Sequence, residues 1–223
     1  MNKKILIDAI TKYLLGLILV MTVLFLPAGT LRYWNAWLLI GLLFIPMLIV
    51  GIILSISNPN LLKRRLESKE KETKQKEVIL LSGVMFVLGF IIAGLNYQYR
   101  WNILPNSVII ISSIIFIISY ILYGEVLREN EYLSRTIKVE KNQKVIDTGL
   151  YRIVRHPMYA ATILLFLSIP LILGSIISFI VFLMYPIIII KRIENEEKVL
   201  EKELKGYKEY KRKTKYKLIP YIW

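Results

Sequence analysis

The chain has 223 residues, of which 56% are hydrophobic, and thirty Lys and Arg against 16 Asp and Glu give a net charge of +14. Since a soluble domain is about 45–50% apolar, this composition and a mean hydropathy of +0.54 predict a polytopic membrane protein. The absence of cysteine excludes disulfides, iron–sulfur clusters, thiolate zinc sites and a cysteine nucleophile. A single histidine excludes a histidine-rich metal site, so we expect no metal centre.

Apolar runs predict an all-α fold with about six transmembrane helices. Four helices are expected at about residues 5–28, 34–56, 78–95 and 104–127. The last apolar run, 158–190, is too long for one crossing, because a helix rises about 1.5 Å per residue through a hydrocarbon core about 30 Å thick. Pro170 and Gly174 near its middle predict a C-terminal helical hairpin with a tight turn.

The distribution of positive charge predicts the topology. Twenty-eight of the 30 Lys and Arg lie in the N-terminal flank, the 57–77 loop, the 128–157 connection and the tail after residue 190. The loops between them hold only Arg32 and Arg100. By the positive-inside rule, this predicts a multi-pass protein of the inner (cytoplasmic) membrane with both termini in the cytoplasm. The same placement assigns the basic residues to anionic membrane lipids, and we expect no nucleic acid partner.

These boundaries divide the chain into two regions. Residues 1–127 are expected to form an N-terminal four-helix transmembrane region with a cytosolic loop at 57–77. Residues 128–223 comprise a cytosolic connector, a helical hairpin at 157–192 and a cytosolic C-terminal tail. Because the polar side chains gather in the second region, a reaction there would join a water-soluble reactant and an apolar one from the bilayer.

Two segments of the second region carry side chains suited to chemistry. Pro157 fits the first turn of a helix, which places His156 among free backbone N–H groups, and Tyr159 follows about one turn later. In the tail, Arg192 and Glu196 are four residues apart and share a helix face. The residues alone leave two interpretations open: interfacial anchors with a surface ion pair, or an inward-facing site that binds an anion.

The two segments are part of a longer series of motifs. The series consists of Gly149, Tyr151, Arg155-His156-Pro157, Tyr159, Arg192, Glu196-Glu197, Gly206-Tyr207 and Tyr210, preceded by Asn58-Pro59 with Leu61-Leu62. Over about residues 135–210 it resembles the isoprenylcysteine carboxyl methyltransferase family, whose wider group includes phospholipid N-methyltransferases.

The resemblance implies an S-adenosylmethionine-dependent methyltransferase with a lipophilic small-molecule or prenylated acceptor. The residues that it implies in cofactor binding are Lys144, Val145, Ile146, Tyr151, His156, Pro157, Met158, Tyr159 and Glu196. It further implies that Arg192 faces the acceptor, that Arg192 and Glu196 are the catalytic pair, and that Arg135-Thr136 matches a further cofactor contact. Carboxyl O-methylation of an isoprenylcysteine-like acceptor is the first expectation.

Other functions stay open at this point. A lipid amine as acceptor would make the protein an N-methyltransferase, and a carboxylate such as Glu197 or Glu129 could then remove the amine's proton. An NADPH-dependent membrane lipid reductase could have a similar C-terminal hairpin. A transporter or assembly factor is a third class, although the apolar cores of the first four helices lack the charges that a transporter uses. The sequence names neither the acceptor nor the oligomeric state.

Overall fold

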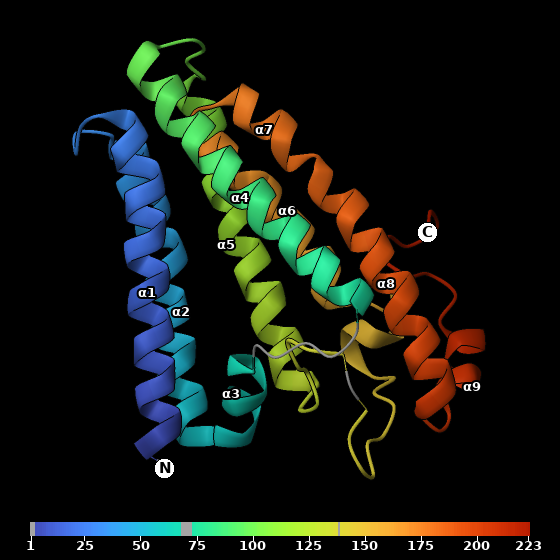
Figure 1. Ribbon diagram of the computed structural model, residues 1–223. Helices are drawn as coiled ribbons and strands as arrows, with labels where there is room; N and C mark the ends of the chain where they lie inside the picture. The colour runs from blue at the N-terminus through green and yellow to red at the C-terminus, as the bar shows by residue number, and fades with distance from the viewer. Residues whose placement is uncertain (1–2, 68–72, 138) are drawn as a thin grey trace.

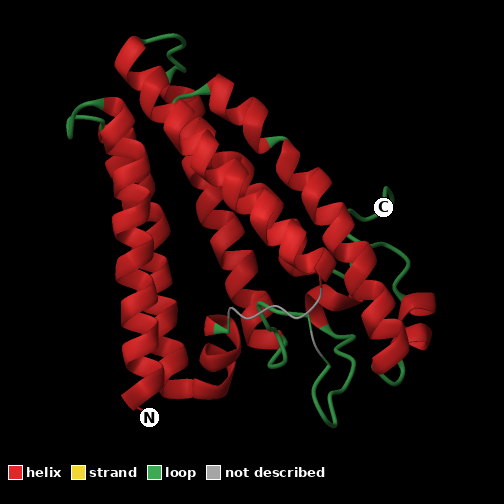
Figure 2. Cartoon of the chain, in the orientation of Figure 1, coloured by secondary structure: helices red, strands yellow, loops and turns green. Residues whose placement is uncertain are grey.

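The structure is a computed structural model that describes residues 3–67, 73–137 and 139–223. Within these ranges the chain forms helices and loops and no strand (Figure 2). The first part of the described chain contains four long helices and one short helix, α3. They are α1 (Lys3–Ala28), α2 (Trp34–Ser57), α3 (Pro59–Leu66), α4 (Thr73–Tyr99) and α5 (Asn106–Glu129). The predicted all-α polytopic fold is confirmed.

The predicted helical hairpin is present, with one additional break. Helix α6 (Pro157–Ile172) ends at a turn in which Gly174 has a φ of 76°, a conformation that favours glycine. The return arm is divided into α7 (Ile176–Phe182) and α8 (Met184–Glu203). Pro186 has no N–H to donate to the carbonyl of Phe182, which explains the break. Helix α8 continues well beyond the apolar run that ends at residue 190.

Five helical stretches of the described chain are long and apolar enough to cross a membrane. They are Ile5–Ala28, Trp34–Ser57, Gln75–Tyr99, Asn106–Glu129 and Ile176–Glu203. The sixth predicted crossing corresponds to α6, which has only 16 residues and spans about 24 Å at 1.5 Å per residue. Pro157 at the start of α6 and the turn at Gly174 after its end set this length. The chain is therefore a multi-pass integral membrane protein in which one apolar helix is shorter than a typical crossing.

Glycines allow close helix contacts in the bundle. A Cβ atom on Gly94 of α4 would lie 2.6 Å from the carbonyl oxygen of Leu24 in α1. A Cβ atom on Gly89 would lie 2.3 Å from the ring of Phe182 in α7. Small residues at such crossings let helix backbones approach in a membrane, where burial of apolar surface drives association less than it does in water. Helix α4 is thereby packed between α1 and the hairpin.

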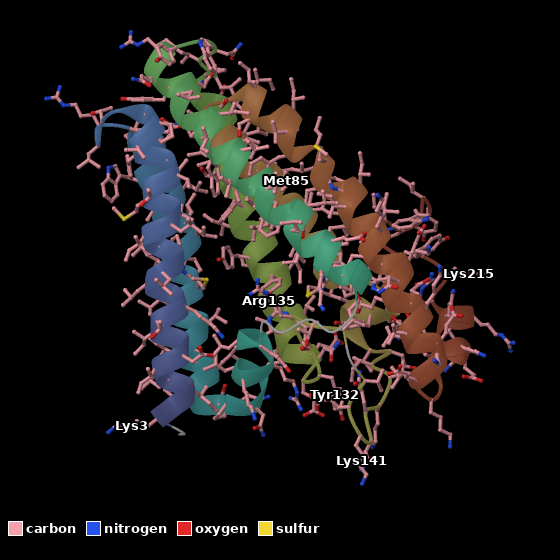
Figure 3. The ribbon with its side chains drawn as sticks, in the orientation of Figure 1. Lys3, Met85, Tyr132, Arg135, Lys141 and Lys215 are labelled. Atoms are coloured by element: carbon pink, nitrogen blue, oxygen red, sulfur yellow. The ribbon has the colours of Figure 1, made fainter. Side chains whose placement is uncertain are left out.

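The basic segments gather at one end of the bundle, which we call the basic end (bottom of Figure 1). It contains the start of α1, helix α3, the connector at 130–156 and the chain after α8, which includes α9 (Tyr207–Lys213). Figure 3 labels Lys3 and Lys141 at this end. In the predicted 57–77 loop, α3 forms a short surface helix, whereas Lys69 and Lys71 lie outside the described residues.

Candidate functional site

The connector enters α6 through a tight turn that is capped by a glutamate. A short 3₁₀ helix, η1 (Gly149–Arg152), begins where Gly149 has a φ of 47°. The carboxylate of Glu129, at the end of α5, accepts hydrogen bonds from the Thr148 hydroxyl and the Leu150 N–H, each at 3.0 Å. The Glu129 carboxylate thus holds the connector against α5.

A methyl group at Gly149 should disrupt this cap. In Gly149→Ala, the new Cβ would lie 2.0 Å from a carboxylate oxygen of Glu129, at a backbone angle that side chains rarely adopt. We expect a loss of about 1–3 kcal/mol in the free energy of unfolding, measured by denaturation of the detergent-solubilised protein. Gly124→Ala is the matched control, because nothing lies within 4 Å of its added Cβ. Equal stabilities of the two variants would contradict the proposed cap.

The tail after α8 folds back onto the connector. The hydroxyl of Tyr210 in α9 donates to the backbone carbonyl of Tyr151 at 2.7 Å, and Asn130 donates to the Tyr151 hydroxyl at 2.8 Å. Burial raises the pKa of both tyrosines, so both phenols keep their protons at neutral pH. The backbone N–H groups of Arg155 and His156 donate to the carbonyls of Tyr216 and Lys217, each at 2.9 Å.

A buried ion pair fastens the tail to the entrance of α6. The guanidinium of Arg155 donates to a carboxylate oxygen of Glu197 at 2.6 Å, and both side chains are nearly inaccessible, with 4% and 6% exposed. Arg155 also donates to the carbonyls of Thr214 and Lys215, at 2.8 and 2.7 Å. The ring of His156 lies 3.2 Å from the same oxygen of Glu197.

The catalytic pair predicted from the sequence meets at a tyrosine. The hydroxyl of Tyr159 donates to the carboxylate of Glu196 at 2.5 Å and accepts from the guanidinium of Arg192 at 2.8 Å. Arg192 also donates to the backbone carbonyl of Arg135 at 2.7 Å. Arg192 and Glu196 therefore both point toward Tyr159, which supplies the link between them, and their catalytic role stays a prediction.

These elements surround a solvent-open cavity at the basic end. The connector, the start of α6, the half of α8 at the basic end and α9 all contribute to its wall. The residues that line the cavity from the predicted set are Lys144, Val145, Ile146, Tyr151, His156, Met158, Tyr159, Arg192 and Glu196. Of that set only Pro157 is not in the wall, since it forms the first turn of α6. Thr136 lines the cavity as well, whereas its neighbour Arg135 does not.

One polar group in the wall has no partner among the described residues. The hydroxyl of Tyr207 is buried and makes no hydrogen bond there. Burial raises the pKa of this phenol, so it remains a hydrogen-bond donor at neutral pH. A buried donor left unsatisfied costs about 1–3 kcal/mol, which a ligand in the cavity can offset by accepting its hydrogen bond. The sequence pointed to Tyr207 as part of a motif whose tyrosines pack the tail onto the site, and it assigned Tyr207 no cofactor contact.

Two comparisons with known proteins bear on this site. Residues 108–202 match the model of the isoprenylcysteine carboxyl methyltransferase (ICMT) family, and a comparison with curated proteins found no match. The matched range begins in α5 and ends in α8, so it includes the connector, the hairpin and the Arg192–Tyr159–Glu196 link. The family supports a membrane methyltransferase of the isoprenylcysteine type. Through residues 108–202, the chain is similar to the isoprenylcysteine carboxyl methyltransferase family.

Proposed function

We propose that the protein uses S-adenosylmethionine to methylate the carboxylate of a lipophilic, isoprenylcysteine-like acceptor at the cytosolic membrane face. The observation that carries the proposal is a cavity at the basic end, which brings the connector, α6, α8 and α9 together around the Arg192–Tyr159–Glu196 link. The excess of positive charge at this end supports its cytosolic orientation. The family match supports methyl transfer as the reaction.

The cavity wall fits the cofactor's chemical groups. S-adenosylmethionine supplies a methyl group on a cationic sulfur. The carboxylate of Glu196 would pair with the cofactor's ammonium group, and Val145, Ile146 and Leu204 offer an apolar surface for the adenine ring. The unpartnered hydroxyl of Tyr207 would donate to an oxygen or nitrogen of the nucleoside. His156 would contribute by shaping the cavity wall, because its ring is held by Glu197.

Arg192 is the residue best placed to orient an acceptor carboxylate. Its guanidinium is held by the Tyr159 hydroxyl and the Arg135 carbonyl, so its orientation is restricted before the acceptor arrives. A guanidinium can bind a carboxylate through two parallel hydrogen bonds. Fixing the nucleophilic oxygen in this way would lower the barrier to methyl transfer. Because the Tyr159 hydroxyl bonds to both Arg192 and Glu196, it also restricts the orientation of Glu196.

Two glutamates of the protein that could deprotonate an amine are already bound to other groups, and this favours a carboxylate acceptor over an amine. An acceptor carboxylate is ionised at neutral pH and needs no base, whereas an amine must first lose a proton. The two acids considered for that task are Glu129, which caps the connector, and Glu197, which pairs with Arg155. Both carboxylates are thereby committed to the fold. N-methylation remains the second candidate function and NADPH-dependent lipid reduction the third.

Calorimetry and product analysis test these functions together. We expect the purified protein to bind S-adenosylhomocysteine and not NADPH. We also expect membrane extracts incubated with methyl-labelled S-adenosylmethionine to yield a base-labile methyl ester that depends on the protein. Binding of NADPH alone would reject methyl transfer, and a base-stable methylated amine would reject the carboxylate acceptor.

Removing the Tyr207 hydroxyl should weaken cofactor binding. In Tyr207→Phe we expect the dissociation constant of S-adenosylhomocysteine to rise about three- to tenfold, because one hydrogen bond contributes about 0.5–1.5 kcal/mol. Calorimetry measures the change. Tyr216→Phe serves as the control, because Tyr216 belongs to the same tail but lies outside the cavity wall. Unchanged affinity in Tyr207→Phe would contradict the fit of the cofactor to this cavity.

A further inference from the structure

Three arginine side chains from distant parts of the chain converge beside the cavity. Arg65 comes from α3, Arg135 from the connector and Arg192 from α8. The backbone links the segments, because Arg135 donates its N–H to the carbonyl of Arg64 at 3.5 Å and accepts from Arg192 through its own carbonyl. Figure 3 shows Arg135 near the lower end of α5, at the basic end.

The positive charges of this cluster repel one another. Partial burial lowers the pKa of the Arg135 guanidinium, and the nearby charges of Arg65 and Arg192 lower it further. Among the residues that the structure describes, neither Arg65 nor Arg135 forms an ion pair with a carboxylate. Such an arrangement is unfavourable on its own and becomes favourable when an anion is bound.

Neutral groups hold Arg65 in place. Its guanidinium donates to the Tyr123 hydroxyl, lies 5.5 Å from the centre of the Tyr123 ring, and approaches the sulfur of Met158 at 4.0 Å. A phenol, an aromatic face and a thioether orient the group without neutralising it. Its remaining N–H donors can therefore serve a charged ligand.

The neighbouring residue fixes the helix that carries Arg65. Arg64 forms a two-pronged pair with Glu140 at 2.8 and 2.7 Å and donates to the carbonyl of Glu131 at 2.8 Å. Asn58 caps the start of α3 by accepting from the Leu61 N–H at 3.0 Å. Helix α3 is thus attached to the connector by specific contacts, which a helix that only binds lipid headgroups would not need.

The cluster contacts the wall of the cavity. Arg65 contacts Met158 and Arg192 contacts Tyr159, and both Met158 and Tyr159 line the cavity. Arg135 lies next to the cavity-lining Thr136 without lining the cavity itself. An anion held by the three guanidiniums would therefore sit at the rim of the cavity, next to a cofactor inside it.

We propose that Arg65 and Arg135 complete, with Arg192, a binding site for the anionic headgroup of the acceptor. This inference rests on the proposed function and adds that the protein selects acceptors by charge, favouring anionic amphiphiles over neutral or cationic ones. When a carboxylate oxygen bonds to the methyl carbon, the sulfur keeps the electrons of the bond that breaks and the product is a neutral ester. Loss of the negative charge restores the repulsion among the arginines and favours release of the ester.

Binding of matched amphiphiles tests the site. The protein in nanodiscs of neutral lipid is titrated with farnesylthioacetate (the thioether that carries a free carboxylate), farnesyl phosphate, farnesylamine and farnesol, and separately with S-adenosylhomocysteine. The variants are Arg65→Gln and Arg135→Gln, and Arg65→Lys tests rescue of the charge. Arg128→Gln is the control, because Arg128 is at the same end but pairs with Glu125 on the surface.

We expect Arg65→Gln and Arg135→Gln each to weaken binding of the thioacetate about tenfold or more, since a hydrogen bond to a charged group contributes about 1.5–3 kcal/mol. Arg65→Lys should recover part of the loss. Affinity for farnesol and S-adenosylhomocysteine should stay at the wild-type value, and KM for the acceptor should rise more than kcat falls.

Two results would overturn the inference. Arg65→Gln and Arg135→Gln could both match Arg128→Gln toward every amphiphile, or only farnesyl phosphate could respond, which would mean a lipid-phosphate site unrelated to the acceptor. Failure of the proposed function would look different, because the wild-type protein would then bind no S-adenosylhomocysteine. Arg135 lies on the connector and not on α3, so Arg135→Gln tests the site even if Arg65→Gln does not fold.

Discussion

Arg192→Gln is expected to lower kcat/KM for methyl transfer about a hundredfold or more. Under the proposed function, the substitution would remove two charge-assisted hydrogen bonds to the acceptor carboxylate, each contributing about 1.5–3 kcal/mol, and it would release the Tyr159 hydroxyl. Because the interaction positions the reacting oxygen, we expect the loss in kcat as well as in KM. Initial rates with labelled S-adenosylmethionine and a prenylcysteine acceptor measure both constants.

The matched control for this variant is Lys191→Gln. Lys191 precedes Arg192 on α8, carries the same charge and is exposed. Its loss tests whether general attraction to anionic lipid explains the effect of Arg192. If Arg192→Gln and Lys191→Gln reduced kcat/KM equally, Arg192 would be a membrane anchor and the acceptor site would have to lie elsewhere.

Glu197→Ala is expected to cost about 3–5 kcal/mol of folding stability and to release the tail. The substitution leaves the guanidinium of Arg155 buried without its counter-charge, and an uncompensated buried charge is strongly destabilising. The tail would then lose its attachment at Thr214 and Lys215, and α9 would no longer close the cavity. We expect a lower Tm, faster proteolysis after α8 and loss of S-adenosylhomocysteine binding.

Two further variants separate the buried pair from a general effect of charge. Glu194→Ala removes an exposed carboxylate from the same helix and should leave Tm and cofactor binding near the wild-type values. Adding Arg155→Met to Glu197→Ala removes the orphaned charge, so the double variant should be more stable than strict additivity predicts. Additive losses would show that Arg155 and Glu197 act independently.

The sequence predicted the helices well because the signals for them are local. Apolar runs of membrane length mark α1, α2, α4 and α5 within a few residues. Pro157 and Gly174 mark the start of α6 and the turn of the hairpin, since one lacks a backbone donor and the other permits a positive φ. Pro186 also carried a signal, but the break before α8 was not predicted.

Contacts between distant segments were predicted less completely. The ion pair between Arg155 and Glu197 joins residues 42 positions apart, and no periodicity within either segment indicates it. The sequence treated Glu197 and Glu129 as candidate bases, whereas the fold uses Glu197 in that pair and Glu129 as a cap. A glutamate has the same local pattern in either role, and only its partners in space distinguish them.

The basic residues of α3 illustrate the same limit. From the sequence, Arg64 and Arg65 were part of a charged segment assigned to lipid headgroups. In the structure Arg64 binds Glu140, and Arg65 turns toward Tyr123 and Met158. Adjacent residues on a helix point about 100° apart, so two arginines side by side can have separate tasks.

The sequence by itself determined that this is a multi-pass helical membrane protein with its polar chemistry at one end. Hydropathy and the distribution of positive charge follow from composition along the chain, and they need no knowledge of which helices are neighbours. Only the tertiary structure decided which polar side chains share a cavity: it placed Tyr159 between Arg192 and Glu196, and Arg65 beside Met158. Hydrogen bonds and ion pairs act over a few ångströms, so they depend on helix packing and loop closure, which a local pattern does not encode.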